Sequence, residues 1–390
     1  AGTIYIQDAM LNQGLVAYPY IETTTAPVAG GILEDMPRLD WSGSCPALLL
    51  EPSRTNRFNY SEALYQLPVK AGVSWEDNVT ISPEGLQNAG KLTEGTGFQY
   101  LGQSSLQGAN RVISVFAKYD NSLTRIALGQ YITTNQVANA VFNIQTGTIL
   151  SETTGSSNVM ILEDAGVEDY GNGWRRYWVS VSGSNGVAYV APSNSDTISF
   201  VPNYTGSGQH CFLYGLQYEQ DATYPTSYIP TYGVSQTRLE DLATASNIAS
   251  LIGQTEGTLF VEYNGAHEGN DGERIVAISD GTSSNRIVLF ENNNKIRLYV
   301  ADGGTAQWDY TSSVDFEGTH KIAVAYASND ASIFIDGVKL ASNTSFVVPS
   351  MPNLYLGKTP SRPVLGGTIN QALLFPTALS DSECIALTTI

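Results

Sequence analysis

Short runs in which apolar and polar side chains alternate recur through most of this chain, and clusters of Gly, Asn or Ser close them, as at 112–117 and 176–181. Successive side chains of a β-strand point to opposite faces of a sheet, so such runs indicate short strands with one buried face. The segment 331–340 joins two apolar runs by Asp336-Gly337, a pair typical of hairpin turns whose central residues need positive φ. Many such strands at close spacing predict an all-β fold built from antiparallel β-sandwiches.

The composition agrees with a β-rich protein and restricts its partners. With 390 residues, 42% of them hydrophobic, the chain is long enough for two or three domains with full cores. Charged residues make up 14%, against about 25% in ordinary domains. The 19 basic and 37 acidic residues give a formal charge of −18 without any basic run, which argues against nucleic acid or an anionic membrane as a partner. The acidity suits solubility and extracellular exposure, with a cationic partner as the alternative.

Cys45, Cys211 and Cys384 lie far apart in the chain. Their odd number and wide spacing argue against a disulfide framework or a CxxC metal site and predict buried free thiols. No apolar run reaches 18 residues, so no membrane insertion is expected. The chain opens with Ala1, which is compatible with processing or with a place in a longer polypeptide.

The strand pattern divides the chain into four parts. Residues 1–50 contain apolar clusters without a sustained period, and we expect an extended N-terminal arm that either packs along the next domain or exchanges between protomers. Residues 51–232 and 255–390 have the strand pattern, and 233–254 is expected to be a linker. The expected architecture is therefore two antiparallel β-sandwich (jelly-roll) modules behind the arm.

Five segments of the first 232 residues resemble one group of proteins. They are LLLEPSRTN at 48–56, YSE at 60–62, GNGWRR at 171–176, GLQYE at 215–219 and YPTSYIPT at 224–231. In order and spacing they are similar to tailed-bacteriophage fibre and appendage proteins, whose signature is LLLEP-x-RTN. The resemblance implies a jelly roll similar to carbohydrate-binding modules, and a virion-surface location after assembly in the host cytoplasm. It also implies contact with other virion proteins through the arm, and a homo-oligomer, with a trimer favoured.

A second resemblance covers residues 255–390. HKIAVAY at 320–326, IFIDGVK at 333–339, NLYLGK at 353–358 and the closing segment 369–383 are similar to the concanavalin A-like or laminin G-like lectin fold. That resemblance implies a lectin-like domain, for which host-surface polysaccharide is the expected ligand on a virion. A purely architectural decoration protein of the capsid or tail, which binds only its virion neighbours, is an alternative.

No catalytic residues are predicted. A glycoside hydrolase needs two carboxylates opposed across a cleft, and hydrolases with the concanavalin-like fold carry Glu-x-Asp-x-x-Glu or a close variant on one strand. The only Glu-x-Asp in this chain, at 219–221, lacks the following Glu, and His210, His267 and His320 are isolated in sequence. A tail-associated polysaccharide depolymerase remains the alternative, since 22 tyrosines leave room for a lyase that combines a Tyr or His base with an Arg.

Glycan binding uses an aromatic ring that stacks on the apolar face of a pyranose, with polar groups nearby for the hydroxyls. The candidates in the second module are Trp308, Tyr310, Tyr299, Arg297 and Arg274, and packing in the core or between subunits is the alternative for each ring. If Trp308 stacks on sugar, its replacement by alanine is expected to weaken binding by roughly 1 to 3 kcal/mol.

The loop 268–273 carries candidate metal ligands. Asn270, Asp271 and Glu273 offer hard oxygen ligands of the kind that Ca²⁺ prefers. A plain turn is the alternative, because Asn, Asp and Gly are the usual residues of hairpin turns. No other cofactor is expected.

Overall fold

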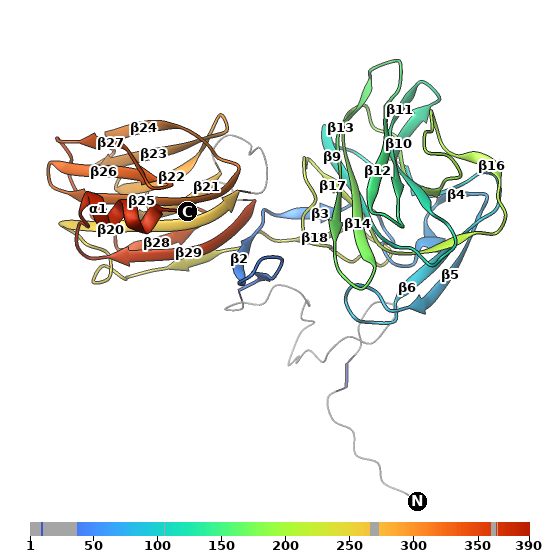
Figure 1. The fold of residues 1–390 in the computed structure, drawn as a ribbon, viewed down its shortest axis with the longest axis horizontal. Helices are drawn as coiled ribbons and strands as arrows, with labels where there is room; N and C mark the ends of the chain where they lie inside the picture. The colour runs from blue at the N-terminus through green and yellow to red at the C-terminus, as the bar shows by residue number, and fades with distance from the viewer. Residues whose placement is uncertain (1–8, 11–36, 105, 266–272, 360–363, 365) are drawn as a thin grey trace, which may run out of the picture. The chain divides into compact units, whose positions relative to one another are not determined.

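The computed structural model of the protein describes residues 9–10, 37–104, 106–265, 273–359, 364 and 366–390. From residue 37 onward the chain forms two compact units, here called the first unit (54–238) and the second unit (37–53 together with 239–390). Antiparallel strands make up nearly all of the regular structure (Figure 1). The predicted all-β fold with antiparallel sandwiches is confirmed.

The first unit has two main sheets, with the strand orders β12-β11-β10-β15-β8-β4 and β13-β14-β9-β17-β3-β18, and β6 joins β5 to β17. The first sheet comprises β12 (Thr148–Thr154), β11 (Gln136–Asn143), β10 (Arg125–Thr133), β15 (Val187–Pro192), β8 (Tyr100–Gln103) and β4 (Val69–Ala71). The second comprises β13 (Met160–Asp169), β14 (Trp174–Gly183), β9 (Asn110–Lys118), β17 (His210–Gln220), β3 (Arg54–Asn56), β18 (Gln236–Arg238), β5 (Val73–Thr80) and β6 (Ala89–Glu94). A separate ribbon pairs β7 (Thr96–Phe98) with β16 (Asn203–Thr205), and η1 (Leu64–Gln66) is a short 3-10 helix.

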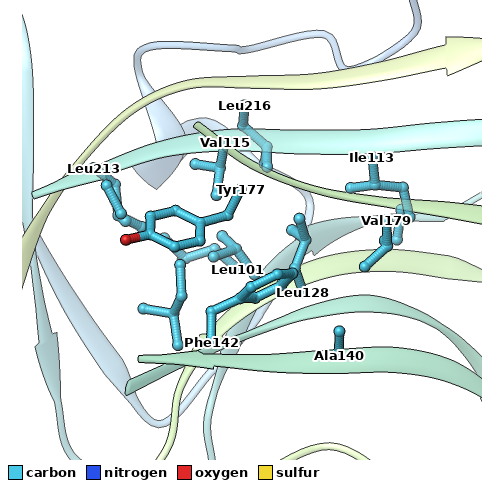
Figure 2. Packing of buried hydrophobic residues seen from close by; sticks show 14 of the residues in the cluster. Leu101, Ile113, Val115, Leu128, Ala140, Phe142, Tyr177, Val179, Leu213 and Leu216 are labelled. Carbon is cyan, nitrogen blue, oxygen red and sulfur yellow. The ribbon is translucent and has the colours of Figure 1, made fainter. Parts of the chain in front are cut away.

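The core of the first unit lies between its two main sheets. Ile113 of β9 points into this core, to which Leu128 and Phe142 contribute from the other sheet (Figure 2). On the opposite face of β9, Phe116 packs in a second buried cluster with Trp174. Because β9 is covered on both faces, its sequence is a nearly continuous apolar run and not a strict alternation.

The second unit pairs a seven-stranded sheet with a six-stranded one. The larger sheet has the order β1 (Leu39–Asp40), β2 (Ala47–Leu50), β29 (Gly367–Phe375), β20 (Glu256–Gly265), β25 (Gly318–Ala327), β26 (Asp330–Ile335) and β27 (Val338–Asn343). The smaller has the order β19 (Ala243–Ala245), β28 (Asn353–Leu356), β21 (Arg274–Ser279), β22 (Arg286–Asn292), β23 (Lys295–Asp302) and β24 (Thr305–Asp315). Helix α1 (Asp381–Thr388) supplies Cys384 to a buried cluster that also holds Phe260 and Phe334.

The hairpin predicted at Asp336-Gly337 is confirmed. These residues have φ angles of 50° and 77°, and they connect β26 to β27, which pair antiparallel. The carboxylate of Asp336 also accepts a hydrogen bond from the backbone N–H of Lys321 at 3.0 Å, and it lies 2.7 Å from Nδ1 of His320. His320 therefore serves this turn, while His267 lies outside the described residues.

The boundary of the expected arm differs from that of the structure. Residues 1–8 and 11–36 lie outside the described part, but β2 is a strand of the second unit, in which Leu48 pairs with Ile369 and Leu50 is buried in the core. Arg38 lies between Glu51 and Asp241, 2.8 Å from the first carboxylate. The short apolar run of β2 has no partner strand nearby in the sequence, because its partner β29 lies near the other end of the chain.

The expected linker at 233–254 is also partly strand. Its first half supplies β18 to the first unit, and its second half supplies β19 to the second. Cys211 and Cys384 are buried free thiols as predicted, whereas Cys45 is exposed, because it lies in the turn between β1 and β2. No helix in the described ranges is long and apolar enough to span a membrane.

Segments 48–56, 171–176 and 215–219 contribute buried polar side chains to the first unit. Asn56 of the RTN sequence is fully buried, and its amide donates to the carbonyls of Leu216 and Ile229 at 3.3 and 2.8 Å. Its side-chain oxygen accepts hydrogen bonds from the N–H groups of Phe58 and Tyr218 at 3.1 and 3.0 Å. One side chain thereby joins β3, β17 and the 224–231 segment.

A buried ion pair connects two further segments of this resemblance. Arg176 and Glu219 have side-chain exposures of 2% and 0%, and Nη2 of the arginine lies 3.9 Å from the carboxylate. The guanidinium donates to Ser114 at 3.0 Å, and the backbone N–H of Thr226 donates to Glu219 at 3.1 Å. Glu219, which begins the Glu-x-Asp sequence, is thus enclosed in the first unit's interior.

Candidate functional site

The six-stranded sheet of the second unit has one face in the core and one facing away from it, here called the outer face. On β23 the residues Ile296 and Leu298 are buried in the core, whereas the alternate residues Arg297 and Tyr299 are half-buried. Antiparallel partners share a face, so the pairing of Phe290 with Arg297 places both on the outer face. The outer face thus collects the polar and aromatic residues of β21 to β24.

Arginine and aromatic side chains alternate across the outer face. The guanidinium carbons of Arg274 and Arg297 lie 4.3 and 5.4 Å from the ring centroid of Phe290. On the same face, the guanidinium carbon of Arg286 on β22 lies 5.1 Å from the ring centroid of Tyr299 on β23. Attraction between a cation and the negative face of a ring holds such side chains against each other. The result is a set of cations whose positions are fixed by the rings beside them.

The charges of these arginines are balanced differently. Arg297 donates to both carboxylate oxygens of Asp309, at 2.7 and 2.6 Å, and to Asn292 at 3.1 Å. These hydrogen bonds to Asp309 raise the pKa of the guanidinium. The guanidinium of Arg286 forms no hydrogen bond or ion pair with any residue of the described part, and its Nε is buried. Its two Nη groups, which are not buried, therefore keep their hydrogen-bond donors available for a ligand.

The residues predicted for glycan binding lie on two different faces of this sheet. Arg297, Tyr299 and the buried Arg274 belong to the outer face. Trp308 and Tyr310 of β24 are paired with core residues of β23 and pack against the core themselves, with the Trp308 ring 6.5 Å from that of Phe346. The five candidates therefore do not form one site, and the packing alternative applies to the two β24 rings.

Sequence reasoning missed Arg286, Phe290 and Asp309 of the outer face. Arg286 and Phe290 lie at alternate positions of β22, and Asp309 pairs with Tyr299 across β23 and β24. The period-two pattern of β22 was enough to place Arg286 and Phe290 on one face. The register between strands was needed to place Asp309 beside them.

The predicted calcium ligands are only partly described. Asn270 and Asp271 lie outside the described residues. Glu273 is buried, and its carboxylate accepts a hydrogen bond from the backbone N–H of Gly366 at 3.2 Å. Among the residues that the structure does describe, no three His, Cys, Asp or Glu side chains are grouped so that they could hold a metal ion.

Comparison with known proteins identifies the fold of the second unit. Residues 244–384 match the family model of the concanavalin A-like lectin/glucanases superfamily. No curated protein matches the chain. Solved structures to which the chain is similar include the CBM40 of the Ruminococcus gnavus IT-sialidase bound to α2,3-sialyllactose, at 19% identity and a TM-score of 0.32 over 36% of this chain and 86% of that one.

Two further similar structures are a domain of a bacterial arabinanase and an animal galectin. Domain 4 of AbnA, a GH43 extracellular arabinanase from Geobacillus stearothermophilus, in complex with arabinotriose, has 15% identity and a TM-score of 0.31 over 44% of this chain and 84% of that one. Toad ovary galectin with N-acetylgalactose has 14% identity and a TM-score of 0.25 over 34% of this chain and 96% of that one. The matched family model covers the second unit from β19 to helix α1. It shows that this unit carries a concanavalin A-like domain.

Proposed function

We propose that the protein is a non-enzymatic glycan-binding protein whose ligand binds to the outer face of the second unit. The observation that carries this proposal is Arg286, whose guanidinium lies on Tyr299 beside the second ring, Phe290, and has no hydrogen-bond partner among the described residues. The concanavalin A-like fold supports the proposal, because the family includes lectins.

The chemistry of the outer face suits a sugar. Tyr299 and Phe290 are half-buried, and beside the arginines that pack on their rings they keep some apolar surface for a sugar to contact. Arg286 offers donors for hydroxyl or carboxylate oxygens, and Asp309 and Asn292 lie nearby as acceptors. A few fixed polar groups around apolar surface are the usual composition of small-ligand sites.

We further propose that the chain is a virion structural protein of a tailed phage, in a tail fibre, an appendage or a decoration, and that host-surface polysaccharide is its ligand. This part rests on the five sequence segments between residues 48 and 231. Attachment to other virion proteins through residues 1–36 belongs to the same proposal. Labelling of intact particles with an antibody against the second unit tests the location, and unlabelled particles would refute it.

A homotrimer belongs to the proposed function because one glycan site binds weakly. Several sites on one assembly raise avidity through their effective concentration. Sedimentation velocity at micromolar concentration should give the mass of three 41.9 kDa chains. A single species of monomer mass would instead indicate attachment as separate copies.

Replacing Arg286 by alanine should weaken binding of the intact protein to host polysaccharide by about tenfold. The variant loses a charged donor to the ligand, and a tenfold change corresponds to about 1.4 kcal/mol. Binding is measured by biolayer interferometry on immobilised polysaccharide, with the melting temperature recorded for each variant.

Lys295→Ala is the matched control for this experiment. Lys295 is a cation of the same sheet face, but it pairs with Asp315 and its side chain is 36% exposed. Equal loss of binding in both variants would show that only general charge matters and would count against a site at Arg286. Release of new reducing ends or unsaturated uronic products from the polysaccharide would favour a depolymerase over a binding protein.

A further inference from the structure

We propose that the first unit carries a separate binding site for an uncharged oligosaccharide, in a hollow beside Phe98. The hollow has a volume of about 420 Å³, and Phe98, Thr134 and residues between 194 and 203 line it. Small-ligand sites typically measure roughly 300–1,000 Å³. The volume therefore suits a short saccharide.

The segment that forms the wall lies on the sheet face opposite the main core. Val201 is buried there with Tyr189 of β15 and Ala127 of β10, and Phe200 packs against this cluster. On β10 the neighbours of Ala127 belong to the main core, so this cluster occupies the sheet's other side. The wall is thus supported from beneath by the sheet.

Specific contacts fix the wall in place. The side chain of Thr153 donates to the carbonyl of Ile198 at 3.1 Å, and the backbone N–H of Gln99 donates to that of Pro202 at 3.0 Å. The ring of Phe200 meets that of Tyr131 edge to face at a centroid distance of 5.0 Å. A site held in this way loses little conformational entropy when a ligand binds.

An aromatic ring stands at the edge of the hollow. Phe98, the last residue of β7, is 47% exposed although it is a large apolar residue. Its ring meets Phe200 edge to face at 6.1 Å. Such an exposed ring offers the apolar platform on which a pyranose stacks.

The polar side chains of the hollow have unused hydrogen-bonding groups. Thr134, Asn194, Ser199 and Asn203 are exposed, and none of their side chains forms a hydrogen bond with the described part of the chain. Hydroxyl and amide groups both donate and accept, as sugar hydroxyls do. An exposed ring beside several free groups of this kind is the combination that a saccharide requires.

The ligand is expected to be uncharged because no ionisable side chain lines the hollow. Asp196, which lies in the same segment, forms an ion pair with Arg125. The outer face of the second unit, in contrast, carries three arginines. The two sites should therefore take different classes of glycan.

The test measures binding of the intact protein to neutral hexose and N-acetylhexosamine trisaccharides, by saturation-transfer NMR and titration calorimetry. Phe98→Ala should weaken this binding by about tenfold, or about 1.4 kcal/mol, because the variant loses the ring on which the sugar stacks. Phe98→Tyr should bind as the wild type does. Asn203→Ala provides a second variant at an exposed position and should weaken binding less.

Tyr65→Ala is the control, because Tyr65 is an exposed ring of the same unit outside the hollow. Arg286→Ala should leave binding of the neutral probes unchanged, which separates this site from the outer face of the second unit. The inference is wrong if no neutral probe binds at millimolar concentration, or if binding survives both Phe98→Ala and Asn203→Ala. Loss of the neutral probes in Arg286→Ala alone would place the ligand on the outer face and would equally overturn the inference.

Discussion

Replacing Arg176 by alanine is expected to reduce the free energy of unfolding of the first unit by about 3–5 kcal/mol. The substitution leaves the carboxylate of Glu219, which is fully buried, without its cation. It also removes the hydrogen bond to Ser114 and the contact of the guanidinium with the ring of Phe116, whose centroid lies 5.5 Å away. Urea unfolding followed by tryptophan fluorescence measures the loss.

The cost should depend on pH. Burial raises the pKa of Glu219 above its ordinary value of 4.5, and the charge of Arg176 opposes that rise, so the variant has the higher pKa. A carboxyl group whose pKa is raised by folding weakens the fold as the pH rises from 4.5 through the folded-state pKa. The difference between variant and wild type should therefore be larger at pH 8 than at pH 5.

A surface ion pair supplies the control. Lys91 pairs with Glu76, whose side chain is 60% exposed, and Lys91→Ala should cost less than about 1 kcal/mol at either pH. If Arg176→Ala costs no more than Lys91→Ala, the buried pair does not stabilise the first unit in the way described.

The second large effect is a loss of stability in the second unit when Trp308 is replaced. Trp308→Ala should reduce the free energy of unfolding of the second unit by about 2–3 kcal/mol, less than for a fully buried ring, because Trp308 is half-buried at the edge strand β24. Binding of polysaccharide to the outer face should stay unchanged, since the ring points to the other side of the sheet. Thermal melting and the binding assay described for Arg286 provide the two measurements.

This outcome would differ from the expectation based on sequence alone, in which Trp308 stacks on sugar. Trp308→Phe, which keeps an aromatic ring against Phe346, should recover most of the stability. A Trp308→Ala variant that melts normally but no longer binds polysaccharide would place the ligand on the core side of β24 and would refute the outer-face proposal.

The contrast between Tyr299 and Trp308 illustrates how far the sequence predicts this site. Alternation within β23 indicates that Arg297 and Tyr299 share a face. Which residues of β24 join them depends on the register of the two strands, and that register shifts at irregularities on β23, including one between Val300 and Ala301. A shift of one residue exchanges the two faces of a strand. Composition and spacing therefore predicted the strands but not the face.

The fold class was predictable because its signals are local. The strand pattern and the turn at Asp336-Gly337 depend on neighbouring residues only. The division into units was not predictable, because it depends on the pairing of Leu48 with Ile369, which lie far apart in the chain. Asn56 and Arg176 belong to the segments that resemble phage fibre proteins, but the sequence does not show what these two residues do. Their burial in the structure shows that they hold the first unit together.

Since β2 precedes the first unit in the chain and pairs with β29 near the C-terminal end, the first unit is an insertion within the second. The growing chain on a ribosome would therefore complete the inserted unit first. The sheet that contains β2 can form only after its last strand, β29, has been synthesised. Arg54 and Arg238, the two ends of the insertion, are paired residues of β3 and β18. Once folded, the insertion brings the two parts of the second unit's chain together and removes most of the entropic cost of closing so long a loop.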